Sequence, residues 1–196
     1  RGYNSNLKNL DYLSVSNSIV TEVCDLRDLS QIIYMIKKYS PDEIYNLAAQ
    51  SSVSISFNQP IATVEFNILS VLNILEAIRI AKPDARFYQA STSEMYGGVK
   101  EMPITLDSPL TPVSPYAVSK VAAHLLTNNY RQSYEIFACC GVLFNHESYL
   151  RADNFFVKKV IKSAILISKG ELDELKVGNI DIKRDFGYVP DYVEAI

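Results

Sequence analysis

The stretch IATVEFNILSVLNILEAIRIAKPDARFYQA, residues 61–90, decides the fold class. Its first part carries apolar residues every three or four positions from Ile61 to Ile78, which is the period of an α-helix with one buried stripe. Pro83 ends this helix, and residues 85–90 then have the character of a β-strand. A long helix that leads directly into a strand is typical of the βαβ unit of a parallel sheet.

Segments of the same two characters alternate on both sides of this stretch. Residues 136–144 are almost wholly apolar, as expected for a strand that is buried on both faces of a parallel sheet. We therefore predict right-handed βαβ crossovers and an α/β fold with a doubly wound parallel sheet. The other expected strands are residues 18–24 and 43–48, and the other expected helices are residues 30–39 and 116–134.

The composition is that of an ordinary globular protein, with 196 residues, 48% hydrophobic residues and a net charge of −3. Such a charge gives no general attraction to nucleic acid or to an anionic membrane. Acidic and amide side chains interrupt the apolar stretches, so none approaches the ~20 apolar residues of a membrane span. No signal peptide is visible, and an odd number of cysteines indicates a reducing compartment, so we expect a cytoplasmic protein.

The cysteines and histidines have no spacing typical of a metal or redox site. Cys139 and Cys140 lie inside the apolar run, where we expect core residues because free cysteine behaves as a small hydrophobe. His124 and His146 have no cysteine or carboxylate arranged with them as a ligand set, so we expect no metal.

A region of different character begins after residue 144. A polar loop is followed by a basic helix expected over residues 154–169 and a short strand expected over residues 175–177. We therefore predict a first domain over residues 1–144 and the start of a smaller region over residues 145–196.

The motif SPYAVSK, residues 114–120, places Tyr116 and Lys120 four positions apart at the start of a predicted helix. A free phenol ionises near pH ~10, and lowering this pKa to ~7 requires about 4 kcal/mol, which a nearby ammonium in a partly dry site can supply. Tyr116 is then a plausible acid or base. A surface pair has the same spacing, so the motif alone leaves both interpretations open.

The motif STSEMYG, residues 91–97, directly follows a predicted strand. Ligands of open α/β sheets collect at the carboxyl ends of the strands, so Thr92 and Glu94 are placed where a hydroxyl and a carboxylate can act on a substrate. Turn and cap chemistry would explain the same two residue types.

Five motifs in the same order resemble the GDP-mannose 4,6-dehydratase family of the extended short-chain dehydrogenases/reductases. The resemblance is close from about Ser40 onward and implies an NAD(P)-binding Rossmann-like fold. It makes residues 1–144 the coenzyme-binding domain and residues 145–196 the start of a substrate-binding region. The motifs are YNLAAQS (45–51), STSEMYG (91–97), the Tyr116 and Lys120 pair, FNHES (144–148) and GNIDIKRD (178–185).

The resemblance also implies a mechanism, the elimination of water from GDP-mannose by a lyase with bound NADP, for which NAD is the alternative coenzyme. Tyr116 would take the proton of the hydroxyl on the fourth carbon of the sugar, and Thr92 would orient that hydroxyl. Lys120 would hold the nicotinamide ribose and lower the pKa of Tyr116. Glu94 would act as the base that removes the proton next to the new ketone, so that water leaves from the sixth carbon.

Further binding residues follow from the same resemblance. For Arg1 a solvated terminal charge is an equal alternative, and for Leu47 and the two alanines an apolar strand end is an equal alternative. The implied substrate-binding residues are Ser93, Asn145 and Arg184. The implied coenzyme-binding residues, besides Tyr116 and Lys120, are Arg1, Asp25, Leu26, Leu47, Ala48, Ala49, Gln50, His146 and Arg151.

The chain also departs from the family pattern. None of its seven glycines forms the glycine-rich turn of a Rossmann coenzyme site, so we expect the sheet to be incomplete at its N-terminal side, without the first βαβ unit. Two alternatives stay open, another nucleotide-sugar epimerase or reductase of the same family and a non-catalytic nucleotide-binding module. The resemblance implies a homodimer or homotetramer, with no nucleic-acid or membrane partner.

Overall fold

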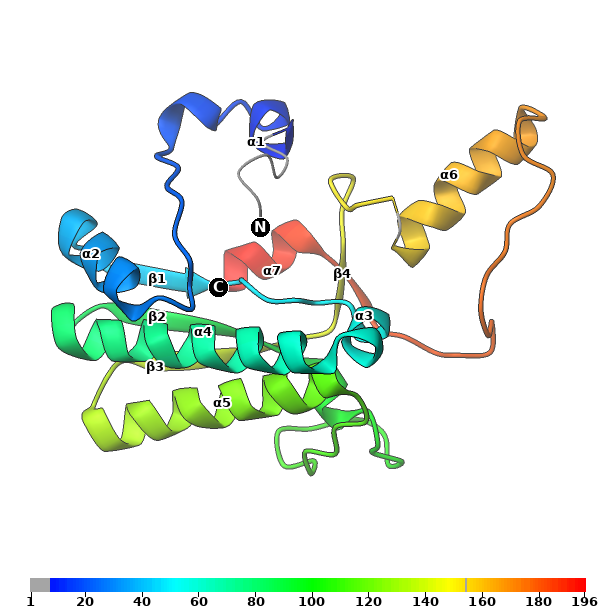
Figure 1. Cartoon of the computed structure of the whole chain (residues 1–196). Helices are drawn as coiled ribbons and strands as arrows, with labels where there is room; N and C mark the ends of the chain where they lie inside the picture. The colour runs from blue at the N-terminus through cyan, green and yellow to red at the C-terminus, as the bar shows by residue number, and fades with distance from the viewer. Residues whose placement is uncertain (1–7, 154) are drawn as a thin grey trace. The chain divides into compact units, whose positions relative to one another are not determined.

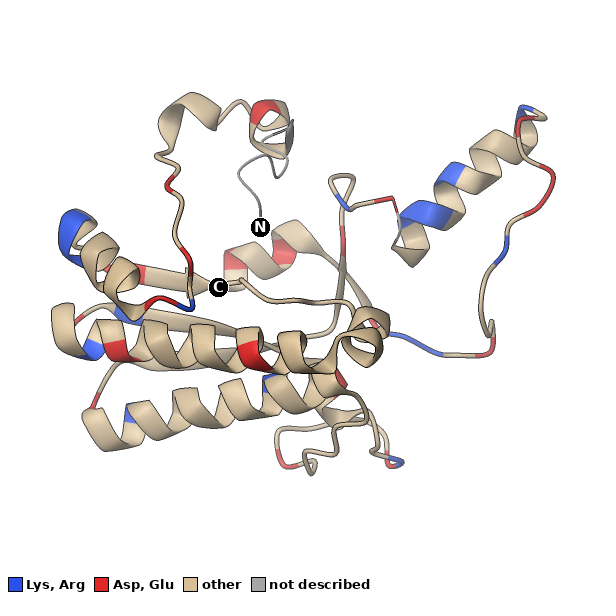
Figure 2. Ribbon diagram, viewed as in Figure 1, with Lys and Arg blue, Asp and Glu red and all other residues tan. Residues whose placement is uncertain are grey.

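The computed structural model describes residues 8–153 and 155–196, which form two compact units (Figure 1). One unit is Glu22–Leu143, and the other consists of the N-terminal residues up to Thr21 together with Phe144–Ile196. Acidic and basic residues are interspersed over the elements of both units (Figure 2). The functional division into domains 1–144 and 145–196 stays a prediction.

The larger unit is built on a parallel sheet, as the sequence predicts. Its strands are β1 (Glu43–Asn46), β2 (Arg86–Thr92) and β3 (Ala138–Leu143), in the spatial order β1-β2-β3. Adjacent strands pair in parallel, with Phe87 opposite Ile44 on one side and opposite Ala138 on the other. The two crossovers are helical, which confirms the α/β class.

Three long helices pack side by side over this sheet (Figure 1). They are α2 (Leu29–Tyr39), α4 (Pro60–Ala81) and α5 (Pro115–Tyr134), with the short α3 (Val53–Asn58) leading into α4. The predicted helices therefore form within one or two residues of their expected ends. Because α4 follows β1 and α5 follows β2, the carboxyl ends of both strands open toward helix N-termini at one edge of the sheet.

The core lies between the helices and the sheet. Phe87 from β2 is 1% exposed, and Leu75 and Ile78 from α4 are fully buried beside it. Burial of side chains of this size contributes about 1.5–3 kcal/mol each. The β2 strand is therefore fixed from its buried centre toward its carboxyl end at Thr92.

Helix α4 is the one described helix with the length and apolar composition of a membrane span. Half of its most apolar window is buried, and it packs against both α2 and α5. Core packing thus accounts for its composition. Its buried residues include amides as well as aliphatic side chains, among them Asn67 and Asn73.

Two predicted strands do not form. Residues 19–25 run without regular structure after a single 3₁₀ turn, η1 (Ser16–Ser18), although Cys24 packs against the core. Residues 175–177 are likewise irregular. In both places the backbone is not hydrogen-bonded to another strand among the described residues. Apolar side chains alone do not make a strand without such pairing.

The expectation that residues 136–144 are buried on both faces is also wrong. Strand β3 is an edge strand of the described sheet, and Cys139 on it is exposed while Cys140 is partly buried. Tyr45 and Tyr88 lie in register with Cys139 on the face opposite to the packed helices. Within this unit the helices pack on one face of the sheet, so only every second residue of β3 meets their core.

The other unit contains shorter elements. Its parallel strands β4 (Asn145–Glu147) and β5 (Phe186–Tyr188) were not predicted, nor were the terminal helices α1 (Lys8–Tyr12) and α7 (Val189–Ala195). The predicted basic helix forms as α6 (Phe156–Ser168). The Tyr192 ring lies so close to Gly187 that a Cβ there would meet it at 2.1 Å, so β5 requires glycine at this position.

Candidate active site

The candidate site lies at the carboxyl end of β2, where the chain continues into the 3₁₀ helix η2 (Ser93–Tyr96). Helix α5 begins beside it, with the Ser114 hydroxyl accepting a hydrogen bond from Ala117 N at 3.1 Å and Pro115 in the first turn. This cap fixes the helix start. Tyr116 and Lys120 therefore occupy the first two turns of a well-defined helix.

Lys120 is a buried cation. Its side chain is 5% exposed, and Nζ donates a hydrogen bond to the Ala90 carbonyl oxygen at 2.8 Å. Burial lowers the pKa of Lys120 to about 8. Nζ also lies 6.0 Å from the centroid of the Tyr116 ring, so the two side chains face each other rather than diverge.

Tyr116 is 7% exposed, and the Thr92 hydroxyl lies near its phenol. Burial raises the pKa of Tyr116, the Thr92 hydroxyl lowers it, and the nearby charge of Glu94 raises it further. The expected lowering of this pKa by Lys120 is therefore not met, because desolvation of the phenolate dominates. Tyr116 is held here as a neutral phenol.

Thr92 has two contacts at once. Its hydroxyl accepts a hydrogen bond from Glu94 N at 3.3 Å, and so caps η2, in addition to its contact with Tyr116. The cap chemistry considered as an alternative is thus present, and it places Glu94 at the same strand end. The structure brings together Thr92, Glu94, Tyr116 and Lys120.

The loop after β1 is anchored by residues that the sequence analysis missed. Asn67 on α4 accepts from Gln50 N at 2.8 Å and donates to the Gln50 carbonyl at 3.1 Å and to Ser119 Oγ at 2.9 Å. The Ser119 hydroxyl donates to the Tyr116 carbonyl at 2.7 Å. Asn67 thus ties the predicted coenzyme loop to the helix that carries Tyr116 and Lys120. Its position within an otherwise apolar helical stripe was the signal available in the sequence.

The other predicted coenzyme residues of this unit have varied surroundings. Asp25 is ion-paired with Arg27 at 2.8 Å, and the hydrogen bonds of Arg27 lower the pKa of Asp25 to about 2. Leu26 packs against the core rather than projecting from it. Leu47 is 65% exposed, while Ala48 and Ala49 are partly buried at the end of β1.

Four predicted site residues belong to the other unit, and Arg1 lies outside the described residues. His146 packs edge-on against Tyr192 with ring centroids 3.9 Å apart, and its buried Nε2 has no hydrogen-bond partner in the part of the chain that the structure describes. The Arg151 guanidinium lies over the Phe155 ring at 3.5 Å. The two others in this unit are Asn145, which donates to the Asp185 carbonyl at 3.0 Å, and the exposed Arg184.

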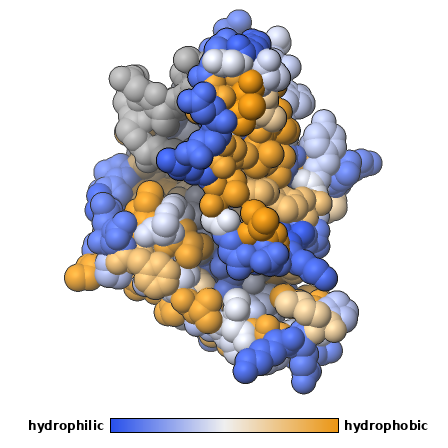
Figure 3. All heavy atoms as spheres, turned by 90° about the vertical axis from the view of Figure 1, so that its right-hand side faces the viewer, coloured by the Kyte–Doolittle hydropathy of each residue, from blue (hydrophilic) through white to orange (hydrophobic). Residues whose placement is uncertain are grey.

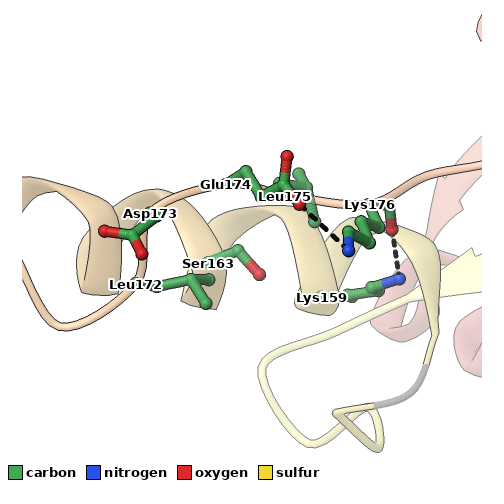
Figure 4. Close-up of a pocket in the computed structure, with 7 residues that line it drawn as sticks. All are labelled: Lys159, Ser163, Leu172, Asp173, Glu174, Leu175 and Lys176. Atoms are coloured by element: carbon green, nitrogen blue, oxygen red, sulfur yellow. Dashed lines mark hydrogen bonds and ion pairs between the residues drawn. The ribbon is translucent and has the colours of Figure 1, made fainter.

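A hollow lies between α6 and the chain that follows it (Figure 4). Lys159 Nζ donates to the Lys176 carbonyl at 2.6 Å, and Lys176 pairs with Glu174 at 3.0 Å. These contacts occupy the basic groups at its wall. The full lining is Lys159, Ser163, Leu172, Asp173, Glu174, Leu175 and Lys176. Among residues 8–153 and 155–196, no three His, Cys, Asp or Glu side chains are grouped as metal ligands.

The parallel sheet, its helical crossovers and the Tyr116 and Lys120 pair at the strand ends define a Rossmann-like protein of the extended short-chain dehydrogenase/reductase class. A solved structure of RMD from Pseudomonas aeruginosa complexed with NADPH aligns with a TM-score of 0.84 and 27% identity, over 97% of this chain and 69% of that one. The family model described as GDP-mannose 4,6 dehydratase matches residues 1–196, and the chain belongs to this family.

Curated relatives agree with this assignment. The GDP-mannose 4,6-dehydratase of Yersinia enterocolitica is 47% identical over 171 residues, which are 86% of this chain and 46% of the relative. The GDP-mannose 4,6 dehydratase of Dictyostelium discoideum is 41% identical over 200 aligned positions, which cover 99% of this chain and 56% of the relative. The chain therefore spans about half the length of these relatives.

Proposed function

We propose that this chain carries the catalytic residues of an NADP-dependent enzyme that eliminates water from GDP-mannose to give GDP-4-dehydro-6-deoxy-mannose. The observation that carries this proposal is the convergence of Thr92, Glu94, Tyr116 and Lys120 at one strand end in a chain of this family. The relatives named as GDP-mannose 4,6-dehydratases support the substrate and the reaction.

The residues at this strand end fit a nicotinamide coenzyme. Lys120 and Tyr116 offer an ammonium and a phenol, which suit the hydroxyl groups of a ribose, and Ala48 and Ala49 permit close approach to the end of β1. The NADPH complex of the Pseudomonas protein supports NADP as the coenzyme. When bound, NADP would supply the hydride acceptor for the fourth carbon of the sugar and, once reduced, the hydride donor for the sixth.

Tyr116 acts first as a proton acceptor. The phenol must ionise to take the proton of the hydroxyl on the fourth carbon, and burial opposes this ionisation. The Thr92 hydroxyl and the Lys120 ammonium are the groups on this chain that favour the phenolate. Thr92 also orients the substrate hydroxyl, since its hydroxyl group can both donate and accept.

Glu94 then acts as a general base. The ketone on the fourth carbon makes the proton on the fifth carbon acidic, and the carboxylate removes it. Glu94 passes this proton to the hydroxyl of the sixth carbon, which leaves as water. The fifth carbon afterwards takes a proton from solvent, and Tyr116 releases to solvent the proton that it took from the hydroxyl of the fourth carbon, so atoms balance over the whole reaction.

Further parts of the proposal concern the whole protein. We infer that Asn145, Arg184 and Ser93 contact the nucleotide sugar and that His146 and Arg151 contact the coenzyme, as the family motifs imply. The protein acts in the cytoplasm as a homodimer or homotetramer. The odd number of cysteines and the absence of a disulfide pairing pattern support a reducing compartment.

Replacement of Glu94 tests the reaction type. Glu94→Gln in the complete protein should bind NADP normally and abolish the dehydrated product measured by mass spectrometry after incubation with GDP-mannose. The control is Glu101→Gln, which changes an exposed carboxylate in the same long loop and should leave turnover intact. Unchanged dehydration by Glu94→Gln would overturn the mechanism. A wild-type protein that reduces or epimerises the sugar instead would support an epimerase or reductase, and one that only binds nucleotide would support a non-catalytic module.

A further inference from the structure

Helix α5 meets the end of β2 at a third point beyond the two candidate catalytic residues. Tyr116, Lys120 and His124 follow each other at intervals of four residues, so they lie on one stripe of the helix. The imidazole Nδ1 of His124 lies 3.0 Å from the hydroxyl oxygen of Ser91. No cysteine or carboxylate in the sequence is spaced to form a metal-ligand set with His124, so this contact with Ser91 is the interaction to explain.

Ser91 is the last residue but one of β2, which ends at Thr92. It lies between Ala90, whose carbonyl oxygen accepts the Lys120 ammonium at 2.8 Å, and Thr92, whose hydroxyl contacts Tyr116. Ser91 is 3% exposed. A shift of Ser91 along or across the strand would therefore move both neighbouring contacts together.

The surroundings of His124 set the protonation state of its imidazole in the hydrogen bond with Ser91. Burial lowers the pKa of His124 and the Arg131 charge lowers it further, so the imidazole is neutral near neutral pH. Cys140 approaches from β3, with Sγ donating to the His124 carbonyl at 3.9 Å. The Ser91 hydroxyl is thus the group that contacts the imidazole, the Cys140 thiol contacts the backbone carbonyl of His124, and Arg131 is the charge that acts on the ring.

We propose that His124 is a positioning residue, which holds Ser91 and thereby sets the Ala90 carbonyl against Lys120 and the Thr92 hydroxyl against Tyr116. This inference rests on the proposed function of Tyr116 and Lys120. His124 itself does not touch the substrate. Its contribution reaches the reaction through the backbone of β2, and small displacements of catalytic groups cost large factors in rate, of about 100-fold for about 1 Å.

Two substitutions separate a hydrogen-bonding role from simple packing. Asn in His124→Asn can place an amide near the position of Nδ1, whereas Phe in His124→Phe keeps a ring and removes the hydrogen bond. In the complete protein, His124→Phe should lower kcat for dehydration by about 10-fold to 100-fold with little change in KM, and His124→Asn should restore most of kcat. Gln132→Ala, on the exposed end of α5, should match wild type and serves as control.

A mutant cycle tests the pathway through Ser91. Ser91→Ala should lower kcat as His124→Phe does, and the double variant should lose little more, because both changes remove the same hydrogen bond. Multiplicative losses would overturn the proposal. A full kcat in His124→Phe together with a loss in His124→Asn would also overturn it, since that pattern indicates packing.

A spectroscopic measurement tests the hydrogen bond without turnover. The ¹⁵N resonance of His124 Nδ1 should shift in Ser91→Ala, and no shift would contradict the proposal. If the wild-type protein failed to dehydrate GDP-mannose while this shift occurred, the proposed function would fail and the contact between Ser91 and His124 would stand. The two failures are therefore distinguishable.

Discussion

The two compact units differ in how their helices are held. In Glu22–Leu143, α4 and α5 pack on each other and on the sheet, and Leu75, Ile78 and Phe87 are almost inaccessible. In the other unit, α6 buries only Ser163 among its described residues. Apolar surface gathers on the face shown in Figure 3, and the exposed large apolar residues of α6 are Phe156, Ile161, Ile165, Leu166 and Ile167.

The difference shows where precise geometry can be maintained. Catalytic groups must be held within fractions of an ångström, and a packed core with buried hydrogen bonds provides this. Lys120 and Tyr116 stand on such a core, whereas Arg184 lies on an exposed loop. The candidate catalytic residues thus stand on the well-packed unit, whereas Asn145 and Arg184, two of the three proposed nucleotide-sugar contacts, belong to the less densely packed one.

The largest expected effect compares one phenylalanine from each unit. Phe87→Ala removes a side chain that is 1% exposed and should lower the free energy of unfolding by about 3–5 kcal/mol. Phe156→Ala removes one that is 54% exposed and should cost less than about 1 kcal/mol. Urea unfolding of the complete protein measures both. Equal losses would show that the two units do not differ in packing.

Replacement of Lys120 should change the free energy of unfolding by a smaller amount and in the opposite direction. The pKa of Lys120 is about 8 in the folded state and 10.5 in the unfolded state. Below pH 8 the ammonium is charged in both states, and its burial lowers the free energy of unfolding by the full amount. This destabilisation disappears as pH rises from about 8 to 10.5. The shift corresponds to about 3 kcal/mol. Lys120→Met should therefore raise the free energy of unfolding at pH 7 by up to that amount while abolishing turnover.

The pH dependence sharpens this prediction. The unfolding free energy of wild type should rise between pH 8 and 10.5, relative to that of Lys120→Met. Lys162→Met changes an exposed lysine of α6 that pairs with Asp153, and it should affect stability little at any pH. A Lys120→Met variant that is less stable than wild type at pH 7 would contradict a costly buried charge.

The smallest of the three effects on stability is expected from a comparison of Asn67, which is buried, with Asn145, which is only partly buried. Asn67→Ala leaves the Gln50 N–H and carbonyl without their side-chain partner and removes one of the two hydrogen bonds of Ser119, so it should lower stability by about 1–3 kcal/mol and weaken coenzyme binding. Asn145→Ala removes one exposed hydrogen bond and should lower stability by at most about 1 kcal/mol. Urea titration and coenzyme titration measure the two quantities. Intact coenzyme binding in Asn67→Ala would show that the Gln50 loop does not depend on this anchor.

Much of the larger unit was predictable because its elements have strong periodicity. The apolar repeat from Ile61 to Ile78 and the capped start of α5 specify their helices locally. The strand expected over residues 18–24 failed because pairing depends on a neighbouring backbone, which local sequence does not encode.

The candidate site was only partly predictable for a related reason. The spacing of Tyr116 and Lys120 and the strand-end position of Thr92 and Glu94 follow from local pattern. The raised pKa of Tyr116 depends on burial by distant residues, so it could not be read from the motif. Asn67 and His124 were missed because their partners, Gln50 and Ser91, are far away in sequence.

The most direct test of the proposed chemistry is the reaction of the complete protein with GDP-mannose in heavy water. If Glu94 removes the proton of the fifth carbon and the eliminated water carries it away, the product must contain one solvent deuterium at that carbon, and Glu94→Gln must form no such product. Product without deuterium, or equal deuterium incorporation by Glu94→Gln, would contradict the assignment of Glu94 as the base.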